Sequence, residues 1–205
     1  SDLENPSKLF LAYHILEGLH KRTDLTEFSR FASQALYIYI NRIQEGIVAI
    51  NAKLDDTYSS DVLKTVIAIE TMELIVGLNL KCHTSEQLDC NTIILRDLLC
   101  PLLNWCSSKA RAISETSLST LTKVGHLYGY ESTKDFIHQF TDYIVDGVSQ
   151  MLDNFASNPE VTHVLAVTFK LSSVEVFYYF KDVYERMFKL LEAYHYTNHS
   201  KFIAL

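Results

Sequence analysis

The sequence predicts an all-α protein, built as an α-solenoid in which antiparallel helix hairpins stack side by side. Three observations predict this fold. The 205 residues include six glycines and three prolines, too few for the many tight turns of an all-β domain. Apolar residues recur at helical spacing along most of the chain, and no segment shows the sustained alternation of a strand. The helices form pairs joined by short polar links, which is the pattern of a helical array.

Five helices are predicted in the first half of the chain. Asn5 and Pro6 suit the N-cap and the first helical position of the first helix. Pro101 is expected to kink or split the fourth helix, and Gly129 follows the end of the fifth. The expected ranges are 5–19, 24–53, 60–80, 90–105 and 109–128.

The second half is as regular, and most of its helices begin with a capping signal. Ser132 and Asp135 are expected to cap a short helix, and Thr141 or Asp142 the helix that runs to about residue 155. Another helix is expected at 158–170. Ser172, with Glu175 three residues later, predicts a capping box for a last helix that continues to about residue 194.

The pairs of helices recur at roughly forty residues, which is the spacing of HEAT-type arrays. The helix at 60–80 is apolar on two sides, as expected for a helix that lies between layers. We therefore expect residues 1–205 to be a single HEAT-like solenoid segment with right-handed superhelical stacking. The apolar residues 201–205 resemble the start of a helix, so we expect a piece excised from a longer chain.

Charge and composition exclude several classes of function. The net charge is −7, with 25 acidic and 18 basic residues, which disfavours nucleic acid and anionic membrane surfaces as ligands. The most apolar stretch, 62–80, contains Glu70 and Glu73, so no membrane span is predicted.

No cofactor, metal site or catalytic residue is predicted. Cys82, Cys90, Cys100 and Cys106 form no C-x-x-C pair, and we expect free cysteines packed as small apolar residues. His195 and His199 are four residues apart, but we expect them at an exposed helix end. The chain has none of the phosphate-loop, dinucleotide or zinc-protease motifs, so the prediction is a protein that is not an enzyme and takes no small-molecule substrate.

Four consecutive aromatic residues at 177–180 are the strongest sign of a binding surface. On a helix they cover about 300° and cannot all face one core. We predict that Phe177, Tyr178 or Tyr179 lies at a partner or inter-repeat surface, since interfaces are rich in Tyr and Phe. The alternative is a tyrosine whose ring packs on its own layer while its hydroxyl reaches water.

Residues 110–152 carry a family resemblance. Gly129, Tyr130 and Ser132 end one helix and begin the next, and Asp142 with Tyr143 starts a helix that contains Gly147. In this order and spacing the segment resembles the TELO-two-interacting protein one family, the scaffold subunit of the Triple-T (TTT) complex. Gly147 in mid-helix lowers helix propensity by about 1 kcal/mol relative to Ala, so a close helix approach is expected there. The chain differs from the family's usual pattern at Phe140-Thr141 and at Asp153.

The resemblance implies a non-enzymatic HEAT-repeat scaffold, here a fragment of its carboxyl-terminal half. Its expected partners are the other two TTT subunits, phosphatidylinositol-3-kinase-related kinases (mTOR, ATM and ATR), and the ninety-kilodalton heat-shock chaperone. The implied role is that of a co-chaperone in TOR signalling and the DNA damage response, in the cytoplasm with the nucleus as a second compartment. Two alternatives remain: another HEAT or armadillo adaptor, for instance in transport or trafficking, and a helical enzyme with one deep pocket.

Overall fold

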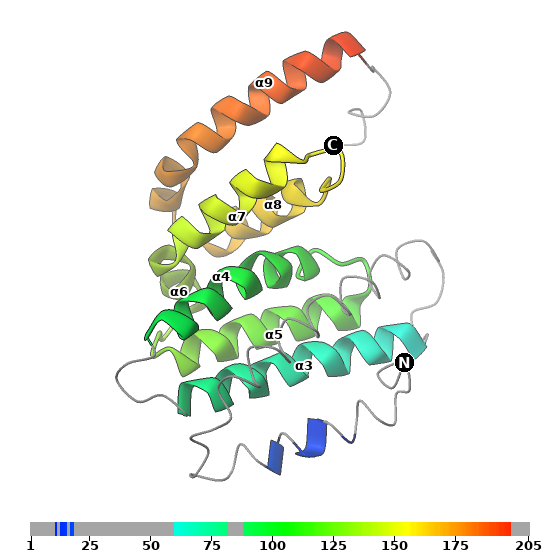
Figure 1. Cartoon of the computed structure of the whole chain (residues 1–205), viewed down its shortest axis with the longest axis vertical. Helices are drawn as coiled ribbons and strands as arrows, with labels where there is room; N and C mark the ends of the chain where they lie inside the picture. The colour runs from blue at the N-terminus through cyan, green and yellow to red at the C-terminus, as the bar shows by residue number, and fades with distance from the viewer. Residues whose placement is uncertain (1–10, 12, 16, 19–59, 82–87, 198–205) are drawn as a thin grey trace.

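The computed structural model describes residues 11, 13–15, 17–18, 60–81 and 88–197, and these residues are helices and short connections (Figure 1). They contain no strand, so the all-α prediction is confirmed for them. Residues 11, 13–15 and 17–18 are helical, whereas the helix expected at 24–53 lies outside the described residues. The elements in chain order are α3 (Ser60–Lys81), α4 (Leu88–Trp105), α5 (Arg111–Leu127), α6 (Thr133–Gln139), α7 (Thr141–Asp153), α8 (Val161–Leu171), the 3-10 helix η2 (Val174–Phe180) and α9 (Lys181–Thr197).

The helices lie in successive rows along the long axis of the molecule (Figure 1). α3 packs along α5, and α4 contacts α5 on one side and α7 and α8 on the other. α9 lies at the far end, where it contacts α7 and η2. The short helix α6 contacts α5, α7 and α8. The described core therefore extends along the stack, because buried apolar side chains pack between each row of helices and the next.

Helix α3 has buried side chains on two opposite sides, which explains why helices pack against it in layers. Ile67 and Ile69 lie on opposite sides of the helix, and both are buried. Thr71 is also buried, and its hydroxyl donates to the Ile67 carbonyl at 2.6 Å. Burial on two sides confirms that α3 lies between layers. One member of its predicted second apolar face, Leu63, is 54% exposed.

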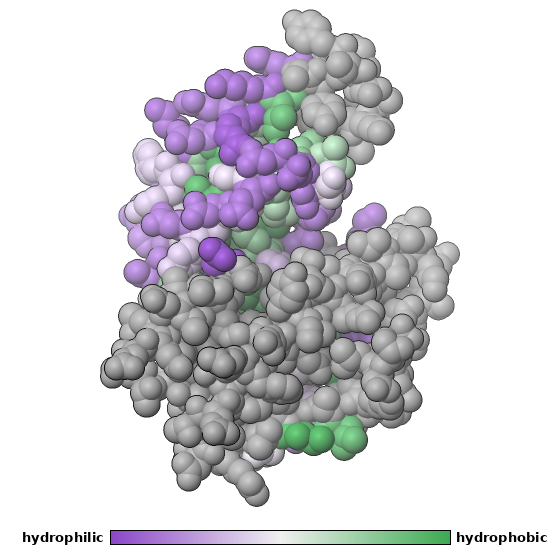
Figure 2. Space-filling model, in the orientation of Figure 1, coloured by the Kyte–Doolittle hydropathy of each residue, from purple (hydrophilic) through white to green (hydrophobic). Residues whose placement is uncertain are grey.

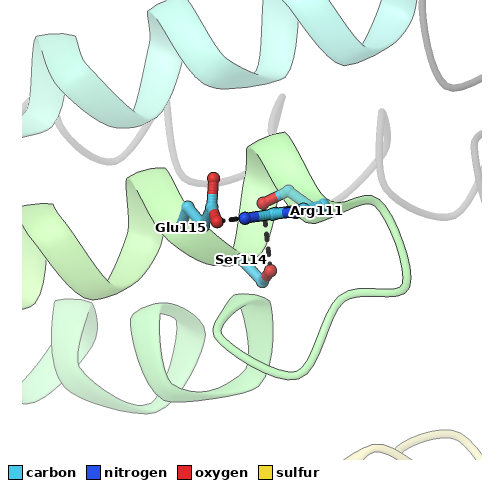
Figure 3. A network of polar contacts seen from close by, with 3 residues as sticks. All are labelled: Arg111, Ser114 and Glu115. Atoms are coloured by element: carbon cyan, nitrogen blue, oxygen red, sulfur yellow. Dashed lines mark hydrogen bonds and ion pairs between the residues drawn. The ribbon is translucent and has the colours of Figure 1, made fainter.

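The described helices α3, α4 and α5 lie close to the predicted ranges, with differences of one or two residues at their ends. α4 continues through Pro101, so this proline does not split the helix. α5 begins at Arg111, two residues later than expected, and its N-cap residue Ala110 offers no capping side chain. Two local contacts lie near this end (Figure 3): Arg111 Nε donates to Glu115 Oε1 at 2.7 Å, and the Ser114 hydroxyl donates to the Arg111 carbonyl at 3.1 Å.

The turn from α5 to α6 follows the sequence signals closely. Gly129 has φ +85°, a left-handed conformation that glycine adopts without steric cost. Its N–H donates to the His126 carbonyl at 2.9 Å, and the Tyr130 N–H donates to the Gly125 carbonyl at 3.0 Å. These two bonds form a Schellman motif. Ser132 Oγ then accepts the Asp135 N–H at 3.1 Å, so the predicted cap of α6 is confirmed.

α7 begins at Thr141, as predicted, but the predicted cap is wrong. The N-cap residue is Phe140, which has no capping side chain, and neither Thr141 nor Asp142 caps the helix. The Thr141 hydroxyl instead donates to the carbonyls of Ile137 and His138, both at 2.9 Å. The carbonyl groups at the end of α6 therefore bind the hydroxyl that the sequence assigned to the start of α7.

The capping box predicted at Ser172 and Glu175 is also wrong. Ser172 is the C-cap residue of α8, and its N–H donates to the Thr168 carbonyl at 2.9 Å. This N–H is therefore not available to the Glu175 carboxylate, as a capping box would require. Glu175 Oε2 lies 3.6 Å from His138 Nε2 instead. The single helix expected from 172 to 194 is divided into η2 and α9.

Candidate protein-binding surface

Four exposed apolar side chains of the described second half cluster on η2. Val174, Phe177, Tyr178 and Tyr179 are 76%, 42%, 81% and 51% exposed. We call these four residues the aromatic ridge. Val176 and Phe180, on the same short helix, are fully buried. Buried Val176 and Phe180 thus anchor η2 to the fold, while the four side chains of the aromatic ridge are exposed.

A second layer of rings fixes the ridge from below. Phe169 of α8 stacks on Phe177, with ring centroids 4.3 Å apart and planes 16° apart. The same ring meets Phe180 edge-on at 5.2 Å and Tyr184 of α9 at 5.8 Å. Such ring pairs favour defined geometries, so in this conformation one face of the Phe177 ring is packed against α8.

Helix α6 contacts the ridge from the side. His138 meets Tyr179 edge-on, with ring centroids 6.2 Å apart, and its Nε2 lies 3.6 Å from Glu175 Oε2. Both side chains are well exposed, and they form an ion pair only when His138 is protonated, so the contact contributes little to stability.

The motif residues singled out by sequence occupy the joint between α5, α6 and α7. Tyr130 lies against Phe136 and Phe140, with ring centroids 5.7 and 5.8 Å apart. Tyr143 stacks on Phe140 at 5.8 Å. Asp142 is exposed in the first turn of α7, where its carboxylate interacts favourably with the helix dipole. Sequence reasoning missed Phe136 and Phe140, although their spacing of four residues was a signal for a shared helix face.

Gly147 confirms the predicted close approach. A β-carbon at this position would lie 2.5 Å from Cys100 Sγ of α4. Cys100 is buried, and its Sγ lies 3.9 Å from the Ile144 carbonyl as a weak donor. Burial raises the pKa of the Cys100 thiol to about 12. The residue at this contact is therefore a protonated, unreactive thiol.

Residues 99–188 match the family model described as TELO2-interacting protein 1. The resemblance to the TELO2-interacting protein 1 family is confirmed. The matched segment runs from α4 into α9 and contains both the aromatic ridge and all six motif residues, which are Gly129, Tyr130, Ser132, Asp142, Tyr143 and Gly147.

Curated relatives support the same conclusion. The TELO2-interacting protein 1 homologs of Homo sapiens and Mus musculus are 26% and 25% identical over 113 residues, which are 55% of this chain and 10% of each relative. The TEL2-interacting protein 1 of Saccharomyces cerevisiae is 31% identical over 101 residues, 49% of this chain and 10% of the relative. The chain thus aligns with about a tenth of the length of these proteins. No solved structure matches it.

Exposed charged side chains lie within the segment that matches the TELO2-interacting protein 1 family. Figure 2 shows hydrophilic residues over much of the described upper part of the view, with apolar residues visible between them. Asp146 of α7 and Asp182 and Glu185 of α9 are exposed. Arg186 pairs with Asp153 and so joins α9 to the end of α7. Phe188 of α9 is also 64% exposed, so the aromatic ridge is the largest cluster of exposed apolar side chains in this part of the described chain but not its only exposed apolar surface.

The cysteines and histidines that were considered as metal ligands lie only partly within the described residues. In the part of the chain that the structure describes, no group of three metal-ligating side chains was found. Cys106 is a half-buried free cysteine, and burial raises the pKa of its thiol to about 12. Cys82 and His199, and the side chains of Cys90 and His195, lie outside the described residues. No described helix is long and apolar enough to cross a bilayer.

The acidic pair in α3 has a structural role. Glu73 Oε2 accepts a hydrogen bond from Lys123 Nζ of α5 at 2.8 Å. This bond raises the pKa of Lys123, with burial acting in the opposite direction. The Glu73–Lys123 ion pair links α3 to α5, and these two helices pack along each other. The geometry therefore assigns Glu73 to helix packing.

Proposed function

We propose that this chain is part of a non-enzymatic, HEAT-type α-solenoid scaffold that binds a TELO2 protein. The observation that carries the proposal is the family match over residues 99–188, which contains the aromatic ridge. The relatives are named for interaction with TELO2 or TEL2. An exposed ridge of Phe and Tyr next to buried anchors has the composition of an interface centre.

The packing of the helices supports a solenoid. α3 lies along α5, and α4, α7 and α9 contact each other in sequence. An array of this kind grows by adding helix pairs and buries its apolar faces between neighbours. Right-handed stacking and a HEAT-type repeat over all 205 residues remain part of the proposal.

Within this proposal the parent protein is the scaffold of the TTT complex, a co-chaperone assembly. It supports the maturation and stability of phosphatidylinositol-3-kinase-related kinases such as mTOR, ATM and ATR, together with the ninety-kilodalton heat-shock chaperone. It works in the cytoplasm, with the nucleus as a second compartment. The support for this role is the family match alone.

The test is a binding titration of the chain with the purified TELO2 protein of the same organism. We expect the wild type to bind and Tyr178→Ala to bind about 30-fold more weakly, as expected when a central interface aromatic is removed. Leu63→Ala is the matched control, because Leu63 is a 54% exposed apolar residue outside the family match. Absence of TELO2 binding by the intact parent protein would contradict the proposal and favour another HEAT or armadillo adaptor.

A further inference from the structure

The segment that carries the aromatic ridge has an unusual conformation. η2 is a 3-10 helix of seven residues, whereas such helices seldom exceed three or four residues. It continues directly into α9 at Lys181, whose φ and ψ of −52° and −51° are α-helical. A 3-10 turn is common at the N-terminus of an α-helix, but a run of seven residues there is unusually long.

The burial pattern of η2 follows α-helical spacing. Val176, Phe180 and Val183 are buried at spacings of four and three residues, which place them on one face of an α-helix. In a 3-10 helix the residues that share a face are three apart. Val174, Phe177 and Phe180 have that spacing, but they are 76%, 42% and 0% exposed. The buried contacts of η2 therefore also suit an α-helix continuous with α9.

A buried hydroxyl at the start of η2 is unused in the 3-10 form. Ser173 is the N-cap residue, and among the described residues its Oγ is buried without a hydrogen-bond partner. The Val176 N–H donates to the Ser173 carbonyl at 3.1 Å. In an α-helix this N–H is freed from the backbone carbonyl, and the side chain of the N-cap residue accepts it. Conversion to an α-helix would thus give the Ser173 hydroxyl a donor.

We infer that η2 is a two-state element, which is 3-10 in the unbound chain and becomes the first turns of a longer α9 when a partner binds the aromatic ridge. Val176 and Phe180 remain buried in both states, and Ser173 caps the longer helix. The rise per residue falls from about 2.0 to about 1.5 Å, which shortens seven residues by about 3.5 Å and turns Phe177 and Tyr179 relative to Phe180. The identity of the partner rests on the proposed function; the existence of two states does not.

The first experiment needs no partner. In NMR spectra of the chain, residues 174–180 are expected to show αN(i,i+2) contacts, which are typical of a 3-10 helix. Val174→Ala/Tyr178→Ala raises α-helix propensity at two exposed positions, and αN(i,i+4) contacts should then appear. A wild type that already shows (i,i+4) contacts, or a double variant that shows only (i,i+2) contacts, would overturn the inference.

The second experiment separates the cap from ordinary packing. Ser173→Ala should leave the unfolding midpoint unchanged or slightly raised, because its buried hydroxyl has no hydrogen-bond partner among the described residues. It should nevertheless weaken TELO2 binding about 2- to 30-fold, as loss of an N-cap does. Ser173→Gly should bind within about twofold of the wild type, since glycine is a tolerated N-cap. Ser172→Ala is the matched control: its Oγ is also buried without a partner among the described residues, but it is not the N-cap. Equal effects of Ser172→Ala and Ser173→Ala on binding would overturn the inference.

The two proposals fail in different ways. If the wild type does not bind TELO2, the proposed function fails, and the spectra of the double variant still decide whether η2 has two states. If the wild type binds TELO2 while η2 keeps its (i,i+2) contacts in the complex, the proposed function stands and the conformational change is excluded.

Discussion

The contact of α4 with α7 and the surface of η2 lie within one family-matched segment and use apolar residues in opposite ways. At Gly147 the two helices approach so closely that a β-carbon would lie 2.5 Å from Cys100 Sγ. On η2, which also contacts α7, Tyr178 is 81% exposed. The first region has no room for an added atom, whereas the second presents rings to the solvent.

This difference separates residues that hold the stack together from residues that are available to a partner. Large-to-small changes in a closely packed region cost stability, whereas changes at exposed positions seldom exceed about 0.5 kcal/mol. Both regions carry residues of the predicted site, so family resemblance alone does not distinguish the two roles. Burial and contact geometry do, and the following predictions measure the distinction.

The largest effect is expected within the aromatic run itself. Phe180→Ala removes a fully buried ring that packs against Phe169, and should lower the free energy of unfolding by about 3–5 kcal/mol. Tyr178→Ala should change it by less than about 0.5 kcal/mol, because Tyr178 is mostly exposed. Denaturant titrations of both variants measure this contrast. Equal losses would show that η2 does not separate anchoring from exposed residues.

The second prediction concerns the close contact. Gly147→Ala gains about 1 kcal/mol of helix propensity but forces its β-carbon against Cys100 Sγ, and overpacking costs about 1–3 kcal/mol. A net loss of about 1 kcal/mol is expected in the free energy of unfolding.

Cys100→Ala provides the matched rescue for this substitution. It removes the sulfur, and the Cys100 β-carbon lies 3.6 Å from the added atom, an ordinary contact distance. Gly147→Ala should therefore stabilise the chain in the Cys100→Ala background. A double-mutant cycle without coupling would contradict the close-packed contact.

The sequence was sufficient where a signal depends on neighbouring residues only. The turn at Gly129 and the cap at Ser132 require local backbone geometry, and both formed as predicted. The apolar periodicity of α3 likewise predicted its burial on two sides. The position of Gly147 predicted a close approach, although the sequence did not indicate Cys100 as the neighbour.

Signals failed where a second element competes for the same group. Ser172 and Glu175 have the spacing of a capping box, but the Ser172 N–H donates to the Thr168 carbonyl at the end of α8. Thr141 donates back to α6 and does not cap α7. Arg186 lies four residues after Asp182, a spacing that favours a pair within one helix, yet it pairs with Asp153 of α7. Such outcomes depend on which helices pack together, and a single sequence does not specify that.

The buried thiols predict a dependence of stability on pH. Burial raises the pKa of Cys100 and of Cys106 to about 12, whereas a thiol in the unfolded chain ionises near pH 8.5. The unfolded chain therefore binds fewer protons between these values, and stability is full below pH 8.5 and falls as the pH rises toward 12. The slope is about 1.4 kcal/mol per pH unit for each thiol. Denaturant titrations from pH 8 to pH 11 should show a shallower fall for Cys100→Ala, and an unchanged slope would contradict the burial argument.

The smallest effect compares the two predicted capping boxes. Ser132→Ala removes the hydroxyl that accepts the Asp135 N–H at 3.1 Å, and should cost about 1 kcal/mol of unfolding free energy. Ser172→Ala removes a buried hydroxyl that has no partner among the described residues, and should be neutral or slightly stabilising, because an unpaired buried polar group is itself unfavourable. The two variants delete the same atom from the same sequence pattern, so thermal unfolding compares the contexts directly. If Ser172→Ala costs as much as Ser132→Ala, a capping bond exists at Ser172 in solution, and the division of the predicted helix into η2 and α9 is wrong.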